Sequence, residues 1–118
     1  MNYKTEIYEQ YMARAVTVDG GEIFLHAFDA QNFVAHCESR NLAILGFDTF
    51  RIDKRGILPL LDGIADFSPQ EKRPWSEYRS TCNLVAAKII EQLLEDKEPE
   101  ETYFSFVLWD ETEYGQST

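Results

Sequence analysis

The residues best suited to acid–base chemistry lie in one stretch, GFDTFRIDKRGILPLLDGIADFS, at positions 46–68. It contains four aspartates, Asp48, Asp53, Asp62 and Asp66. Asp62 and Asp66 are four residues apart, so on a helical turn they would share a face and one could act as a general acid or base. However, Gly63 between them weakens a helix, and Asp66 before FSPQ is equally typical of a turn. We therefore favour a structural role for the set, with Asp62 and Asp66 also accessible to a binding partner.

The histidines and cysteines do not have the spacing of a metal or nucleophile site. His26 and His36 are ten residues apart, and the chain contains no CxxC or HxxxH pattern, which argues against zinc. The aspartates lack the spacing of a calcium loop. Cys37 and Cys82 each lie in an apolar helical pattern, where a thiol packs as a small hydrophobe. We expect no catalytic residue, no cofactor and no metal; the alternative is a small hydrolase-like enzyme that uses Asp62, Asp66 or His36.

Negative charge is concentrated in one part of the chain. Aspartate and glutamate total 21 against 11 lysines and arginines, a net charge of −10. Residues 91–113 contribute −8 of this through nine carboxylates and Lys97: Glu91, Glu95, Asp96, Glu98, Glu100, Glu101, Asp110, Glu111 and Glu113. Such a field repels nucleic-acid phosphates and attracts a cationic protein. Acidity that serves solubility alone is the competing interpretation.

The first half of the chain predicts a hairpin, a helix and a strand. Residues 14–28 form the hairpin around the turn signal DGG. Asp29 is suited to cap a helix over AQNFVAHCESRN, which carries one apolar stripe. LAILGFDTFRI then predicts a strand in which neither face is cleanly apolar, which indicates a bulge near Gly46 or a place at a sheet edge. TEIYEQYMARAVTV is ambiguous, because residues 7–15 include apolar side chains at helical spacing whereas RAVTV favours a strand.

The second half predicts a packed loop, a long helix and an aromatic strand. Glycines and prolines punctuate residues 54–74, whose apolar side chains must lie on the core. A helix begins near Pro74 and runs to about Asp96, with an apolar stripe that includes Leu84 and Val85. KEPEE is a turn, TYFSFVLWD alternates as a central strand, and residues 111–118 form a tail. The chain thus predicts one compact α+β domain over residues 1–118, with a three- to five-stranded, mainly antiparallel sheet and two main helices packed on one face.

Several of these segments together resemble small bacterial immunity-type proteins. The segments are LAILGFDTFRI, the following DGIADFS, the helix led by Trp75 and the terminal strand YFSFVLW, which span about residues 29–109. Proteins of this type are cytosolic partners of toxin domains in contact-dependent growth inhibition and polymorphic toxin systems. The resemblance implies tight stoichiometric binding that blocks a toxin's active site. It implies no particular interface residues, because those surfaces vary between relatives.

The leading hypothesis is a non-enzymatic protein that binds and neutralises the cationic C-terminal domain of a cognate toxin. We expect this toxin domain to be a nuclease. Acids at the end of the long helix oppose its dipole, which points to a functional role. Aromatic residues could anchor the interface if they are exposed. The expected partner-binding residues are Glu95, Asp96, Glu98, Glu100, Glu101, Asp110, Glu111, Glu113, Asp62, Asp66, Trp75 and Tyr78.

The chain also predicts where the protein acts and which partners it lacks. MNYKTEIYEQ has no signal-peptide core, and no run approaches the ~18 apolar residues of a membrane span, so we expect a cytoplasmic protein without a membrane or nucleic-acid partner. The oligomeric state is left open. The third alternative is a structural or regulatory subunit that acts through an edge strand.

Overall fold

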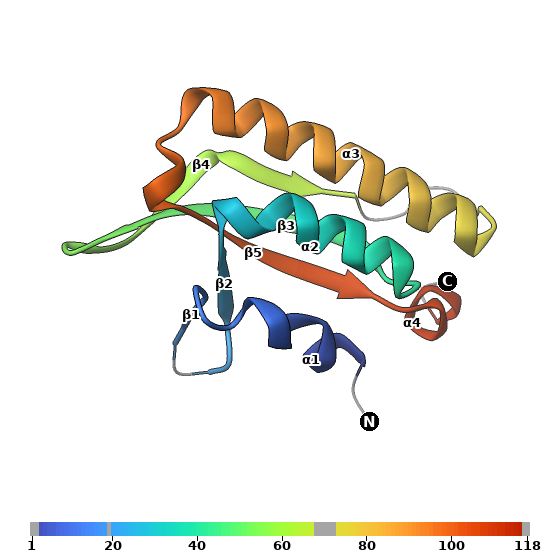
Figure 1. Ribbon diagram of the computed structural model, residues 1–118. Coiled ribbons are helices and arrows are strands. Elements are labelled where there is room, and N and C mark those ends of the chain that lie inside the picture. The colour runs from blue at the N-terminus through green and yellow to red at the C-terminus, as the bar shows by residue number, and fades with distance from the viewer. Residues whose placement is uncertain (1–2, 19, 68–72, 117–118) are drawn as a thin grey trace.

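The fold is a two-layer α+β arrangement (Figure 1). The computed structural model describes residues 3–18, 20–67 and 73–116. Five strands form an antiparallel sheet in the order β1-β2-β5-β3-β4, which confirms the predicted fold class. In chain order the elements are α1 (Tyr3–Tyr8), η1 (Glu9–Tyr11), β1 (Val16–Thr17), β2 (Ile23–His26), α2 (Ala27–Ser39), β3 (Ala43–Asp53), β4 (Gly56–Asp66), α3 (Trp75–Asp96), η2 (Pro99–Glu101), β5 (Thr102–Trp109) and α4 (Glu111–Gly115).

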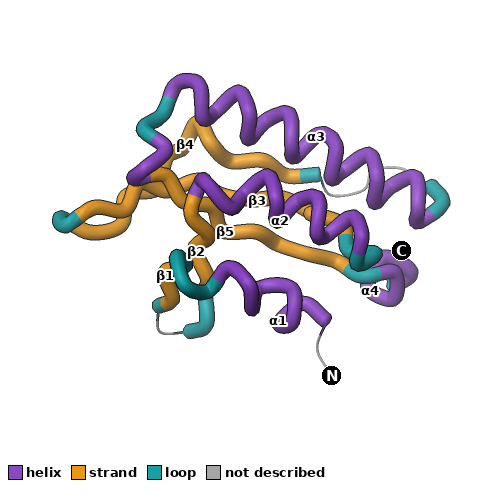
Figure 2. The backbone as a smooth tube through the Cα atoms, in the orientation of Figure 1, coloured by secondary structure: helices purple, strands orange, loops and turns teal. Residues whose placement is uncertain are grey.

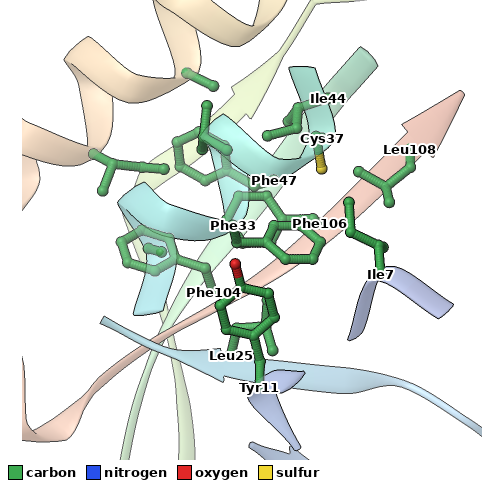
Figure 3. Close-up of a cluster of buried hydrophobic side chains, with 14 of the residues drawn as sticks. Ile7, Tyr11, Leu25, Phe33, Cys37, Ile44, Phe47, Phe104, Phe106 and Leu108 are labelled. Carbon is green, nitrogen blue, oxygen red and sulfur yellow. The ribbon is translucent and has the colours of Figure 1, made fainter. Parts of the chain in front are cut away.

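One aromatic core joins the helices to a single face of the sheet (Figure 3). Phe33 of α2 stacks on Phe106 of β5 with ring centroids 4.9 Å apart, and Phe47 of β3 meets Phe104 edge-on at 5.5 Å. Alternation along β5 is as predicted, because residues 104, 106 and 108 are buried while Val107 on the other face is 53% exposed. Core burial of this kind supplies most of the stabilisation of a small domain.

Both cysteines are buried as predicted. Cys37 belongs to the main core, and Cys82 packs in a smaller cluster beside Tyr78 and Tyr114. Burial raises the pKa of each thiol, which disfavours the reactive thiolate.

The strand β3 contains the bulge that its sequence predicts. Its pairing with β5 shifts register between Ile44 and Gly46, and a second shift against β4 lies between Phe47 and Thr49. The alternative of an edge position is wrong, because β3 lies between β5 and β4.

The expected loop after β3 is instead a strand, β4. Asp53 and Gly56 pair across a two-residue turn, in which the Asp53 carboxylate accepts a hydrogen bond from the Arg55 amide at 2.8 Å. Aspartate at the first position and glycine at the fourth are typical of a type I turn, a signal that predicts this hairpin. Pro59 obscured the strand pattern, but β4 lies at the sheet edge, where a residue without an N–H is tolerated.

Helix ends and tails differ from the predictions in two places. The cap of α2 is His26, whose Nδ1 accepts from the Phe28 amide at 3.2 Å, and Asp29 lies inside the helix. There the Asp29 carboxylate is buried and pairs with Arg14. The predicted tail is the helix α4, because Asp110 and Glu113 form a reciprocal capping box. In the N-terminal segment that the sequence left ambiguous, residues 3–11 are helical and Val16–Thr17 form a strand.

The long helix α3 has the predicted bounds but a different buried face. Leu84 and Val85 were expected in its apolar stripe, yet they are 59% and 36% exposed. Asn83 is buried in their place. The helix therefore turns Asn83 toward its hydrogen-bond partners on β3 and α2, and Leu84 toward solvent.

Candidate partner-binding surface

The acidic segment 91–113 is divided between two ends of the molecule (Figure 2). Its first part covers the end of α3 and all of η2, and its second part forms α4. The eight residues of β5 separate them, a span of roughly 26 Å at about 3.3 Å per residue. The single −8 patch that the sequence suggests is therefore two smaller acidic regions.

The larger region, which we name the acidic end, comprises six carboxylates: Glu91, Glu95, Asp96, Glu98, Glu100 and Glu101. All are exposed except Glu101, which is half-buried. With Lys97 they carry a net charge of −5. None of the ion pairs found among the described residues uses any of the six. The last turn of α3 has no basic residue to offset the negative end of the helix dipole, so the dipole adds to this charge.

Like charges crowd one another within the acidic end. A hydrogen bond to the Glu98 carboxyl raises the pKa of Glu101, and burial and the negative charge of Asp53 act in the same direction. Arg51 opposes this shift but makes its ion pair with Asp53, at 3.7 Å. A cation from another molecule would relieve this repulsion, since it favours the charged form of both carboxyls.

Hydrogen bonds from the sheet hold η2 in place. The Nδ1 atom of His26 accepts a bond, so its Nε2–H donates to the Glu100 carbonyl at 3.0 Å. The Thr102 hydroxyl donates to the Glu98 carbonyl at 2.7 Å. The backbone of η2 is therefore fixed to the start of α2 and to β5.

The smaller acidic region at α4 is occupied by internal contacts. The Asp110 carboxylate accepts from the Glu113 amide at 2.8 Å, and the Glu113 carboxylate accepts from the Asp110 amide at 3.0 Å. Glu113 also forms an ion pair with Lys4. Glu111 is exposed. These contacts explain two of the three acids as parts of a helix cap.

The two aromatic candidates belong to a structural cluster beside α4. Tyr78 is only 6% exposed, stacks on Tyr114 at 4.7 Å and donates to the Phe67 carbonyl at 2.9 Å. Trp75 is half-buried, and its indole N–H donates to the Asn41 side chain at 2.8 Å. Burial leaves Tyr78 with little surface for a partner.

Of the residues of the enzyme alternative, the structure places His36 and Asp66 on different elements. His36 lies against η1, where its Nδ1 accepts a hydrogen bond from the side-chain Nε2–H of Gln10 at 2.9 Å. Asp66 is exposed at the end of the edge strand β4, and the side chain of Asp62 lies outside the described residues. Asp53 caps its own turn, and a backbone hydrogen bond from Arg55 together with the nearby arginine charges lowers the pKa of its carboxyl. Among the described residues, no group of three or more histidine, cysteine or carboxylate side chains could hold a metal ion.

A groove between α2 and α3 was not predicted from the sequence. It has a volume of about 410 Å³, and its apolar lining comes from Val34, Ala35, Leu84 and Ala87. The only signal in the sequence is the position of Leu84, which lies at the margin of the apolar stripe of α3. Whether Leu84 is exposed depends on which residue of α3 faces the sheet.

A polar network closes one end of this groove. Glu38 accepts from Arg79 through both carboxylate oxygens, at 3.2 and 3.0 Å, and from Ser80 and Asn83 at 2.7 and 2.8 Å. Burial by itself raises the pKa of Glu38, but the hydrogen bonds from Ser80, Arg79 and Asn83 outweigh it and lower the pKa below its ordinary value.

No described helix is both long enough and apolar enough to cross a membrane. Comparison of the chain with protein-family models, with curated proteins and with solved structures gave no significant match.

Proposed function

We propose that this chain is a binding protein that docks on a cationic surface of another protein through the acidic end. Because the sequence resembles immunity-type proteins, we propose that the partner is a toxin domain with nuclease activity. The chain would neutralise it by covering its active site. The observation that carries the proposal is the acidic end itself: six carboxylates on adjoining turns of α3 and η2 that make no ion pair with the described residues.

The physical argument is one of complementarity. A cleft that binds nucleic-acid phosphates is lined with lysine and arginine, and carboxylates on a fixed backbone match that pattern of charge. Association with such a cleft is fast because the opposite fields steer the two molecules together. The hydrogen bonds from His26 and Thr102 to η2 reduce the entropy that the acidic end would lose on binding.

A titration against the product of the gene adjacent to that of this chain tests the proposal. We expect stoichiometric binding that suppresses the activity of the partner and weakens as salt rises, since exposed charges are screened. The double variant Glu95→Gln/Glu100→Gln should weaken binding about tenfold, at roughly 0.7 kcal/mol for each exposed charge pair.

The matched control removes the same two charges elsewhere. Glu9→Gln/Asp48→Asn alters exposed carboxylates of η1 and β3, outside the acidic end. It should leave the affinity within about twofold of wild type. A partner that does not bind, or whose binding is indifferent to salt, would sink the proposal; equal losses in both double variants would show that net charge, rather than the acidic end, is responsible.

A further inference from the structure

One end of the groove between α2 and α3, at Ala87, lies one turn of α3 before Glu91 of the acidic end. The Gln31 side chain donates to the Ala87 carbonyl at 2.8 Å, and seven residues further along α2 the Ser80 hydroxyl donates to Glu38 at 2.7 Å. These contacts show that α2 and α3 run antiparallel, as Figure 1 also shows. The helix spacing places Glu91 on the same face of α3 as Leu84 and Ala87, seven and four residues before it.

The apolar surface along this groove is larger than the lining alone. Leu84 is 59% exposed, and Phe28, one turn before Gln31 on the same face of α2, is 57% exposed. Leu84 lines the groove itself, whereas Phe28 lies beyond the lining, with its ring 4.7 Å from that of His26. Monomeric proteins expose single apolar residues routinely, but a large exposed one that lines an apolar groove of about 410 Å³ is a feature of binding sites.

Charge at the two ends of the groove differs and sets a direction. At one end Glu38 is already paired with Arg79. Toward the other end Glu91 and Glu95 are exposed and take part in no ion pair among the described residues, and Lys88 lies one turn before Glu91 on α3. A ligand with apolar residues along its length and cations at one end matches both properties.

We infer that the α2–α3 groove binds an amphipathic helix of the cationic partner, with its apolar side chains over Leu84 and its lysines or arginines toward Glu91 and Glu95. The inference rests on the proposed function and adds an apolar anchor to the charges of the acidic end. A groove between two antiparallel helices accepts a third helix by the helix-in-groove mode. A second copy of this chain is a poor occupant, because it would bring a second net charge of −10 to the same place.

Three synthetic helical peptides of about 16 residues test the inference without knowledge of the partner. The first has leucines on one face and lysines in its last turn, the second replaces the leucines with glutamines, and the third replaces the lysines with glutamates. By fluorescence anisotropy we expect the leucine–lysine peptide to bind about tenfold more tightly than the glutamine–lysine peptide, and the leucine–glutamate peptide not to bind.

Two variants locate the effect. Leu84→Gln should remove most of the advantage of leucine over glutamine, whereas Val107→Gln, at an equally exposed valine on the far face of the sheet, should retain it. Glu91→Gln/Glu95→Gln should weaken both lysine peptides by the same factor. NMR shift changes on binding should include the amides of Gln31, Leu84 and Ala87.

Contrary outcomes separate the groove from the proposed function. Equal binding of the leucine and glutamine peptides, or shift changes confined to the acidic end, would overturn the groove and leave binding through charge intact. Failure of both lysine peptides would also overturn the groove, while the adjacent-gene titration decides the function independently. Self-association that Leu84→Gln abolishes would identify a second copy as the occupant and overturn the inference.

Discussion

The side-chain amide of Asn83 takes the place of a neighbouring strand for the backbone of Ile44. Its Oδ1 accepts from the Ile44 amide at 2.9 Å, and its Nδ2 donates to the Leu42 carbonyl at 2.9 Å. On this side of β3, pairing with β4 begins only at Gly46. A buried asparagine on α3 thus satisfies the stretch of strand that β4 does not reach.

Asn83→Leu should therefore lower the free energy of unfolding by about 3 kcal/mol, because it leaves a buried amide and a buried carbonyl without partners. Urea denaturation monitored by tryptophan fluorescence measures this. Asn32→Leu makes the same exchange at an exposed position of α2 and should change stability by less than about 0.5 kcal/mol. If Asn83→Leu also changes the free energy of unfolding by less than about 0.5 kcal/mol, the hydrogen bonds of Asn83 do not stabilise β3.

The hydrogen bonds to Glu38 should make stability depend on pH. The pKa of Glu38 is lowered in the folded state, so the ionised carboxylate contributes stability above its unfolded value near 4.5, and that contribution is lost as pH falls through the lower folded pKa. More than a third of the side chain is exposed, which limits the contribution to about 1 kcal/mol.

The difference in unfolding free energy between wild type and Glu38→Gln, measured from pH 3 to pH 7, checks this. It should be largest above pH 4.5 and should shrink toward pH 3. The control is Glu9→Gln, which alters an exposed carboxylate of η1 outside any ion pair among the described residues. Its difference from wild type should stay nearly constant over the same pH range. A Glu38→Gln difference that does not change across this range would refute the assigned network.

His26 joins the start of α2 to the acidic end and should contribute through both of its nitrogens. His26→Ala loses the helix cap, about 1 kcal/mol, and the hydrogen bond to Glu100, about 1 kcal/mol more. Asparagine in His26→Asn can still cap the helix but is too short to reach Glu100. The stability of this variant should therefore lie between those of wild type and His26→Ala.

Hydrogen exchange gives a readout specific to η2. Both variants should exchange faster than wild type at Glu101, whose amide donates to the Glu98 carbonyl. If His26→Asn matches His26→Ala in stability and neither changes exchange at Glu101, the bond to Glu100 does not position η2.

Tyr114 should be part of the folded core although the sequence predicted a tail there. Its ring stacks on Tyr78, and its hydroxyl donates to the Arg73 carbonyl at 2.6 Å and accepts from the Arg73 amide at 2.9 Å. Tyr114→Ala should cost about 3 kcal/mol through the lost aromatic packing, and Tyr114→Phe about 1 kcal/mol through the lost hydroxyl. Equal effects of the two substitutions, measured by urea denaturation, would show that packing of the ring contributes nothing.

Local patterns predicted those elements whose residues carry their own signal. The strand β5 alternates without interruption, α3 begins after a proline with a long apolar stripe, and the glycine-rich turn before β2 requires positive φ, which Gly20 and Gly21 adopt. The bulge in β3 was predicted because neither of its faces is cleanly apolar. These features depend on neighbours in the chain, so they are visible in the sequence.

Other features depend on contacts between distant residues and were missed or misplaced. Without β3 beside it, β4 does not resemble a strand, because Gly56, Pro59 and Gly63 interrupt its pattern. The predicted cap of α2 was Asp29, but the cap in the structure is His26. The Asp29 carboxylate pairs with Arg14, and His26 also bonds to Glu100, and both contacts are between residues far apart in the chain.

The sequence by itself determined an acidic α+β domain with an antiparallel sheet and a charged segment near its C-terminal end, because composition and periodicity are properties of the chain. Only the tertiary structure decided how that charge is distributed. The strand β5 carries the chain from one end of the sheet to the other, so six carboxylates gather at the acidic end while Asp110 and Glu113 cap α4. The buried Asn83 likewise sets the rotation of α3, since its bonds to β3 turn Leu84 outward and form the groove beside α2.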